Sequence, residues 1–373
     1  MYFNVNTINA THFENMSSAK GGLAQELEPL PAMVSRLFLS VFICITGLVG
    51  NIAVCVVTCC MRKRSAVSSY IFNLAIADLG ILAVCYPLTI VKSNDPLHWP
   101  LGMFFCKVIY PLSDIFYGAS ISSIVAIALD RYRAIVLSMR AQTSLKAVKW
   151  LIFLIWFCSF IIIVLPLFFV MEYIEDPSRG TIDCTPQWPS VFSMQIYVSC
   201  LTLFFYVIPL SAILWCYRKI AHQILQSKKL HKKILYQLSR RRILQHRQTQ
   251  RNRDENSKAL KILVPIVALF AITMLPFHVF RLCLVFVPNV VRRLPYPWLV
   301  FNVFTILLLG NSSLNPVIYS LVSAEFRQNM KRALRMQWYL LRSSASKTST
   351  ASFSKTSDEY GPNKRTTYIT TTV

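Results

Sequence analysis

The sequence predicts an all-α membrane protein, a seven-transmembrane helix bundle with a short amphipathic eighth helix. Its 373 residues are 54% hydrophobic and only 15% charged, a balance outside the usual range of soluble globular domains. Seven apolar windows can each cross the ~30 Å hydrocarbon core of a bilayer, because about 20 helical residues suffice. The expected spans are residues 37–61, 70–91, 108–129, 150–171, 191–217, 262–287 and 296–322.

The third span carries polar groups at both of its ends. One apolar helix is expected from Cys106 to Val136, with Asp114 near one end and Asp130-Arg131-Tyr132 at the other. The two ends of a helix that crosses a bilayer lie in different compartments, whereas both ends of a helix in a soluble core lie in the same one. The other ionisable residues inside spans are Asp78, His278 and Arg281. Each is costly in lipid unless it faces the bundle interior or water.

The net charge of +23 is distributed unevenly. Lys and Arg gather after the first, third and fifth spans and after the seventh, which predicts that these segments are cytoplasmic. Anionic inner-leaflet lipid is therefore the expected partner of this charge, and nucleic acid is not. The predicted parts are an extracellular glycosylated segment (1–36), a seven-transmembrane bundle (37–322), a membrane-surface helix (323–341) and a disordered cytoplasmic tail (342–373). We expect a multi-pass protein of the plasma membrane.

The segments expected on the outer side contain sequence patterns for two covalent modifications, glycosylation and a disulfide. The first 20 residues contain no apolar signal core, so the first span is expected to direct translocation. Sequons at Asn9 and Asn15 predict glycosylation of the outer segment. Of eleven cysteines, Cys106 starts the third span and Cys184 lies in the long outer loop. An oxidising exterior favours a disulfide between them.

Several motifs occur in a fixed order along the spans. They are Gly50-Asn51, Asn73 through Asp78, Trp99 through Gly102, Asp130-Arg131-Tyr132, Trp156, Pro209 with Tyr217, Phe270 through Pro276, and Asn315 through Tyr319 followed by Phe326. In this order the chain resembles rhodopsin-like (class A) G-protein-coupled receptors of the peptide-receptor type, over residues 36–341. The resemblance implies a receptor that binds an extracellular ligand. It would activate heterotrimeric G proteins by outward movement of helix six.

Arg131 is the centre of the expected activation switch. Pairing with Asp130 would hold it, and release would free a cation for the end of a partner helix. The alternative is a solvated boundary pair with no switching role. The family's acid on helix six is replaced by Asn256, preceded by Glu255, which predicts some basal activity. The resemblance assigns further roles in coupling and activation to Tyr132, Met139, Tyr217, Phe270, Pro276, Asn315, Pro316 and Tyr319, with Pro209 and Ile121 packing near Phe270.

Asp78 lies in the middle of the second span. The resemblance places Ser120, Asn311 and Asn315 around it, an oxygen-rich set that suits a hydrated sodium ion. A protonated Asp78 in a hydrogen-bond network is the competing interpretation. Other metals and cofactors are not expected, because His278 is the only one of six histidines inside a span. An enzyme is therefore not predicted, and the absence of repeated halves argues against a transporter.

The ligand site is predicted at the outer end of the bundle. Phe270, Met274, His278 and Arg281 recur at spacings that place them on one face of helix six. The expected ligand residues are Ser113, Asp114, Tyr117, Glu172, Met274, His278 and Arg281. Arg281 would either bind an anionic ligand group or pair internally with Asp114 or an outer-loop acid. Met274 replaces the tryptophan that the family usually has at this position.

The ligand class follows from charge. Ser113 occupies the position where the family's amine receptors have aspartate, and the last span has no lysine for a retinal Schiff base. The outer loop carries Glu172, Glu175, Asp176 and Asp183, an acidic vestibule that could steer a cationic ligand. A neuropeptide or peptide hormone is therefore expected. The alternative is an anionic lipid or nucleotide bound by His278 and Arg281.

The cytoplasmic tail predicts further partners. Residues from Ser343 onwards are rich in Ser and Thr, as expected for phosphorylation by receptor kinases and binding of arrestin. The final Thr371-Thr372-Val373 resembles a PDZ-domain ligand.

Overall fold

The computed structural model describes residues 29–60, 65–94, 98–137, 143–178, 180–237, 265, 267–322, 326–332 and 335. In this part of the chain, seven helices are long and apolar enough to cross a membrane. They cover Leu30–Cys59, Ala66–Asn94, Gly102–Ile135, Leu145–Val170, Val191–Ser227, Val267–Phe286 and Leu299–Leu321. The predicted fold class, a seven-helix membrane bundle, is confirmed. Most of these helices extend past the predicted apolar windows, because a helix can continue into polar residues outside the hydrocarbon core.

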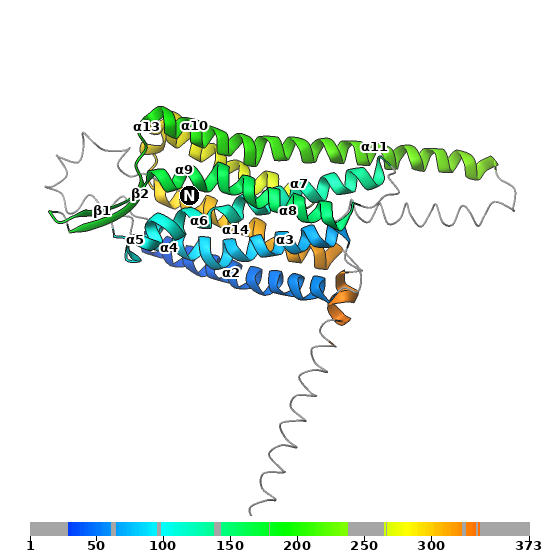
Figure 1. Ribbon diagram of the computed structural model, residues 1–373, viewed down its shortest axis with the longest axis horizontal. Helices are drawn as coiled ribbons and strands as arrows, with labels where there is room; N and C mark the ends of the chain where they lie inside the picture. The colour runs from blue at the N-terminus through cyan, green and yellow to red at the C-terminus, as the bar shows by residue number, and fades with distance from the viewer. Residues whose placement is uncertain are drawn as a thin grey trace, which may run out of the picture.

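Most spans consist of more than one helical segment (Figure 1). The first is α2 (Leu30–Cys59), and the second comprises α3 (Ala66–Gly80), η2 (Ile81–Cys85) and α4 (Tyr86–Asn94). The third comprises α5 (Gly102–Phe104), η3 (Phe105–Ile109), α6 (Tyr110–Ser113) and α7 (Ile115–Ile135), and the fourth α8 (Leu145–Ser159), η4 (Phe160–Val164) and α9 (Leu165–Val170). The fifth comprises α10 (Val191–Thr202), η5 (Leu203–Val207) and α11 (Ile208–Gln237). The sixth span, Val267–Phe286, precedes α13 (Pro288–Arg292) and α14 (Pro297–Val322), which forms the seventh.

Four spans contain a π-helical turn, and each turn ends two residues before a proline. The prolines are Pro87, Pro111, Pro166 and Pro209, which follow η2, η3, η4 and η5. Proline has no N–H to donate to the carbonyl four residues earlier, and its ring crowds that carbonyl. A wider turn relieves this conflict, since the N–H before the proline then bonds five residues back. The helix predicted from Cys106 to Val136 is present within the single span Gly102–Ile135, but it contains a π-helical turn and a break at Asp114 that the sequence did not predict.

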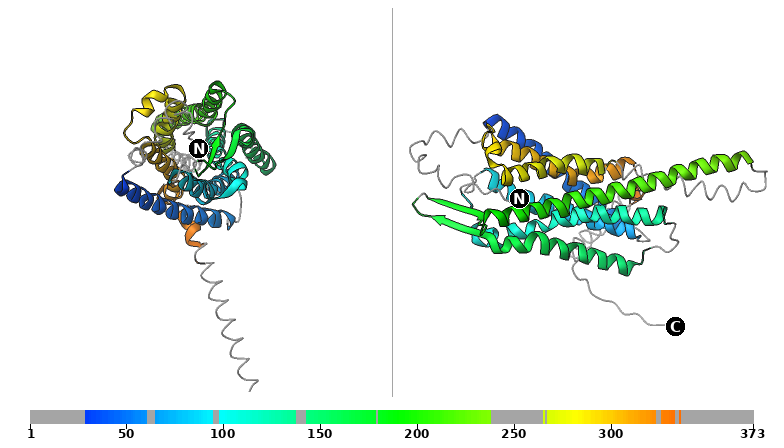
Figure 2. Two further views of the ribbon diagram at one scale, coloured as in Figure 1. Left: turned by 90° about the vertical axis from the view of Figure 1, so that its left-hand side faces the viewer. Right: turned by 90° about the horizontal axis from the view of Figure 1, so that it is seen from above.

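The third span lies in the centre of the bundle. Its α7 packs against α3, α8 and α11, and the view along the helices shows them arranged as a ring (Figure 2). Glycine permits a close approach of α7 to α8, because a Cβ on Gly118 would lie 2.5 Å from Ser159 Oγ. The first and fourth spans have only 28% of their apolar windows buried, against 56% for the third. Their exposed aromatic side chains, among them Phe38 and Phe153, suit contact with lipid.

A β-hairpin projects from one end of the bundle (Figure 1). Strands β1 (Met171–Asp176) and β2 (Thr181–Pro186) pair antiparallel, with Tyr173 opposite Cys184. Cys184 is disulfide-bonded to Cys106 at the start of the third span, as predicted. The backbone N–H of Trp99 also donates a 2.7 Å hydrogen bond to the Ile182 carbonyl. Strand β2 is thus attached both to the third span and to the connection that precedes it.

The opposite end of the bundle carries α11 and the chain that follows α14. The end of α11 projects well beyond the neighbouring helices (Figure 2). Residues 326–332 are helical, and the Phe326 ring lies 6.1 Å from that of Tyr319. These residues lie within the stretch 323–341 where an eighth helix is predicted; apart from residue 335, the rest of that stretch lies outside the described residues, so the eighth helix stays a prediction. Also outside the described residues are Asn9, Asn15, Met139, Glu255, Asn256 and the tail from Ser343 to Val373.

Candidate functional site

A cavity that is partly open to solvent lies between the helices, with about 470 Å³ of empty space when the adjoining open solvent is included. Helices three, four, five, six and seven all contribute to its wall. The lining residues are Asp114, Tyr117, Gly118, Ile121, Ile163, Leu201, Phe205, Met274, Phe277, His278, Arg281 and Leu308. Five of the seven predicted ligand residues are in this set. The cavity is mostly apolar with a few charged groups, as is typical of small-molecule and peptide anchor sites.

The predicted face of helix six is confirmed. Met274, His278 and Arg281 all border the cavity, and Met274 and His278 are only 3% and 6% exposed. Phe270 continues the same face into the core, where it is fully buried with its ring 6.0 Å from that of Tyr206. The spacings of four, four and three residues along the sixth span were sufficient to predict that these side chains share one face, because the helix is regular here.

His278 is held by the fifth span. Its Nδ1 lies 3.3 Å from Thr202 Oγ1, and its ring stacks on Tyr206 with the centroids 5.0 Å apart. These contacts fix the orientation of the imidazole within the cavity wall. The Arg281 guanidinium lies 5.6 Å from the centroid of the Phe277 ring, which keeps the cation against an aromatic surface of the same helix.

Asp114 lies at a break in the third span. It separates α6 from α7, and its N–H bonds back only three residues, to the Pro111 carbonyl at 3.3 Å. Tyr117 continues the tight turn through a 3.2 Å bond to the Asp114 carbonyl. Asp114 borders the same cavity as Arg281, so charges of both signs are present in one site. Internal pairing of Arg281 with Asp114 is compatible with this placement.

Two of the predicted ligand residues, Ser113 and Glu172, do not border this cavity in the described structure. The Ser113 hydroxyl turns back along its helix and donates a 2.7 Å hydrogen bond to the Tyr110 carbonyl. Glu172 on β1 forms an ion pair with Lys107 at 3.0 Å. On the second strand, Asp183 pairs with Lys92. Two acids of the predicted vestibule thus hold the hairpin to the bundle, which reduces the negative field expected of it.

Several apolar lining residues were not predicted as part of the site. Phe205 and Leu201 enter from the fifth span, Phe277 from the sixth and Leu308 from the seventh. Their side chains are uncharged, so nothing in the sequence distinguishes them from ordinary core residues. Phe277 could have been found, because it precedes His278 and lies one helical turn after Met274.

A buried polar cluster surrounds Asp78, deeper in the bundle. Asp78 has no exposed surface, and its two oxygens accept hydrogen bonds from Ser120 Oγ and Asn315 Nδ2, both at 2.8 Å. Among the described residues, the side-chain oxygens of Asn311 and Asn315 are buried without a hydrogen-bond partner. The predicted set is thus gathered on α3, α7 and α14, with oxygen atoms still available for another donor or a cation.

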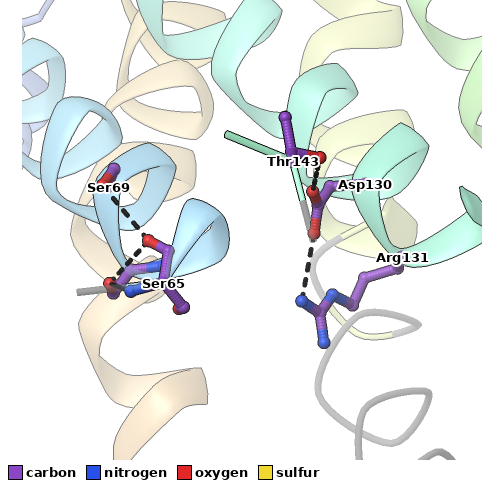
Figure 3. Close-up of polar contacts among 6 residues, drawn as sticks. Ser65, Ser69, Asp130, Arg131 and Thr143 are labelled. Carbon is purple, nitrogen blue, oxygen red and sulfur yellow. Dashed lines mark hydrogen bonds and ion pairs between the residues drawn. The ribbon is translucent and has the colours of Figure 1, made fainter. Parts of the chain in front are cut away.

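The predicted switch lies at the inner end of α7. Arg131 Nη2 donates to Asp130 Oδ2 at 3.1 Å, and Thr143 Oγ1 donates to Asp130 Oδ1 at the same distance (Figure 3). Tyr132 instead packs its ring 4.7 Å from that of Trp215 on α11. No sequence pattern indicates Thr143, because only the fold brings it to Asp130.

The other residues that the resemblance assigns to activation lie along the fifth, sixth and seventh spans. Tyr206 lies in the π-helical turn before Pro209 and donates a 3.2 Å hydrogen bond to the Ala271 carbonyl, next to Phe270. The sixth span is helical through Pro276, and Pro316 lies inside α14. Tyr217 packs near Ile220 on α11, whereas the buried Tyr319 hydroxyl lacks a hydrogen-bond partner among the described residues.

Comparison with known proteins identifies the class. Residues 50–319 match the family model described as 7 transmembrane receptor (rhodopsin family). The chain therefore belongs to the rhodopsin family of seven-transmembrane receptors; it is a receptor and not an enzyme.

Three similar proteins have most of their length covered by the match. Galanin receptor type 1 of Homo sapiens is 29% identical over 276 residues, which cover 74% of this chain and 73% of that protein. Substance-P receptor of Cavia porcellus is 28% identical over 342 residues, with coverage of 89% and 78%. Neuropeptide FF receptor 2 of Rattus norvegicus is 28% identical over 323 residues, with coverage of 81% and 72%.

Proposed function

We propose that this receptor binds an extracellular neuropeptide or peptide hormone. The observation that carries the proposal is a partly open, aromatic-lined cavity bordered by both Asp114 and Arg281. Peptides can present apolar side chains together with charged side chains or termini, so they match such a wall. The names of the similar galanin, substance-P and neuropeptide FF receptors support the same class.

A disulfide and two ion pairs support a fixed position of the hairpin at the rim of the bundle. They attach both strands of the hairpin to the rim of the bundle, through Cys106, Lys92 and Lys107. A hairpin fastened along both strands has fewer conformations in which it can cover the cavity. A preformed entrance lowers the ordering cost of binding.

The bound receptor would activate heterotrimeric G proteins through outward movement of helix six. Met274 borders the cavity and Phe270 lies in the core on the same face of that helix. A ligand that contacts Met274 can therefore displace Phe270. At the inner end, release of Arg131 from Asp130 would expose a cation to the G protein. The long basic α11 and the apolar Met139 would add to this contact.

The cellular arrangement is also proposed from charge and chemistry. We place the receptor in the plasma membrane with the hairpin outside, since the basic ends of the spans lie opposite it. Glycans on Asn9 and Asn15 would then be extracellular. Receptor kinases and arrestin would act on the tail from Ser343, and a PDZ-domain protein on Thr371-Thr372-Val373.

A sodium ion bound beside Asp78 would regulate the receptor. Asp78 contributes a buried carboxylate, while Asn311 and Asn315 contribute side-chain oxygens that lack hydrogen-bond partners in the described structure. These are the hard oxygen ligands that such cations prefer, and the ion would supply the missing counter-charge. A protonated Asp78 would supply one O–H donor, which can bond to only one of the two amide oxygens.

An anionic lipid or nucleotide is the second candidate ligand. Arg281 and His278 border one cavity, which favours an acidic group near both. Against this, His278 is engaged by Thr202 and Tyr206, and Asp114 would repel an anion in the same site.

Challenge of cells that express the intact chain tests these alternatives. Separate pools of peptides, lipids, nucleotides and amines would be applied, with dissociation of each Gα class as the readout. A response confined to the peptide pools is expected. A response confined to lipids or nucleotides would overturn the peptide assignment and favour the second candidate.

A further inference from the structure

The carboxylate of Asp130 is held by two residues that come from different parts of the chain. One oxygen accepts from Arg131, the neighbouring residue on α7, and the other accepts from Thr143 (Figure 3). The Asp130 side chain is only 12% exposed, so both bonds are largely shielded from water. A partly buried carboxylate with both oxygens bonded has a more restricted orientation than one with a single partner.

Thr143 is itself attached to a packed helix. It directly precedes Ser144, the N-cap of α8, whose hydroxyl accepts a 3.2 Å hydrogen bond from the Ala147 N–H. One turn further on, Val148 is only 1% exposed. The Thr143 hydroxyl is therefore carried by the anchored start of the fourth span and not by a free side chain in a loop.

We propose that Thr143 is a positioning residue that keeps Asp130 aligned on Arg131 and thereby limits signalling without ligand. The position that carries an acid on helix six in related receptors is Asn256 here, so that restraint is absent from the sequence. A restraint supplied by the fourth span compensates for this. The inference depends on the proposed role of the Asp130–Arg131 pair in G-protein activation.

The physical reason is the geometry of a shared carboxylate. Arg131 Nε is buried without a hydrogen-bond partner in the described chain, so the guanidinium is held mainly through its bond to Asp130. Loss of the Thr143 donor lets the carboxylate rotate, and the single bond to Arg131 then weakens. One hydrogen bond to a charged group is sufficient to change the ratio of paired to released Arg131 by about tenfold.

The test uses purified full-length receptor with matched variants. Thr143→Val keeps the shape of the side chain without the donor, and Thr143→Ser keeps the donor. Ser144→Ala removes the side-chain cap of α8 and leaves the Thr143 hydroxyl in place. Ligand-free nucleotide exchange on G protein and hydrogen exchange of residues 131–137 are both measured. Thr143→Val should raise both, the former by about three- to tenfold, while Thr143→Ser remains near wild type.

The remaining outcomes separate the two proposals. Equal effects of Thr143→Val and Ser144→Ala would show that only helix stability matters, which would overturn the positioning role. Thr143→Val should have no further effect in an Asp130→Asn background, and an additive effect there would also overturn it. If no variant acts on any G protein, but Thr143→Val still speeds hydrogen exchange at 131–137, the positioning contact stands and the proposed signalling function fails.

Discussion

The side-chain amide of Asn315 donates a 2.8 Å hydrogen bond to Asp78 Oδ2, which joins α14 to α3 inside the bundle. The other Asp78 oxygen is bonded to Ser120 on α7, so one carboxylate connects three spans. Any group that binds this carboxylate will therefore affect how these spans pack together.

Sodium should stabilise the purified receptor through Asp78. At ten times its dissociation constant, an ion that binds only the folded state adds about 1.4 kcal/mol. For a chain of 373 residues that corresponds to about 2 °C in apparent Tm. The comparison is sodium chloride against N-methylglucamine chloride at equal ionic strength. Asp78→Asn should abolish the difference, whereas Asp183→Asn should retain it; a sodium effect that survives Asp78→Asn would contradict the proposed site.

The two hairpin ion pairs should differ in strength. Lys92 and Asp183 have side chains only 11% and 15% exposed, whereas Lys107 and Glu172 are 41% and 45% exposed. Double-mutant cycles with Lys92→Met and Asp183→Asn should give a coupling of about 1–3 kcal/mol. The cycle with Lys107→Met and Glu172→Gln should give less than about 1 kcal/mol, because water and salt screen that pair. Thermal unfolding at low and high salt measures both, and equal couplings would be inconsistent with the burial.

Met274 should tolerate a change of shape better than a gain in volume. It is 3% exposed at the cavity wall, so Met274→Leu should change stability by less than about 1.5 kcal/mol. Met274→Trp should cost about 1–3 kcal/mol and fill part of the cavity. Peptide binding and apparent Tm are measured on both variants. A tryptophan variant with unchanged stability and affinity would show that the cavity is larger or more adaptable than described.

The spans and the face of helix six were predictable for a physical reason. Bilayer thickness sets the length of an apolar window whatever the helix packs against. Within one regular helix, Met274, His278 and Arg281 share a face by spacing alone. Both predictions use only local geometry.

Tertiary contacts decided what could not be predicted. Proline alone does not determine a π-helical turn, because Pro209 follows one, while the span containing Pro276 is described without one. The pairing of Glu172 with Lys107 depends on the placement of the hairpin by the disulfide. The bond from Thr143 to Asp130 likewise requires two spans to meet.

The most direct measurement is the response of wild-type receptor and Arg281→Ala to an active peptide pool, read as G-protein dissociation. Arg293→Ala is the matched control, since Arg293 is an exposed arginine that does not border the cavity. We predict that the wild type and Arg293→Ala respond alike, while Arg281→Ala needs at least about tenfold more peptide, because a charged hydrogen-bond partner contributes about 1.5–3 kcal/mol. A peptide response identical in all three proteins would contradict binding at this cavity.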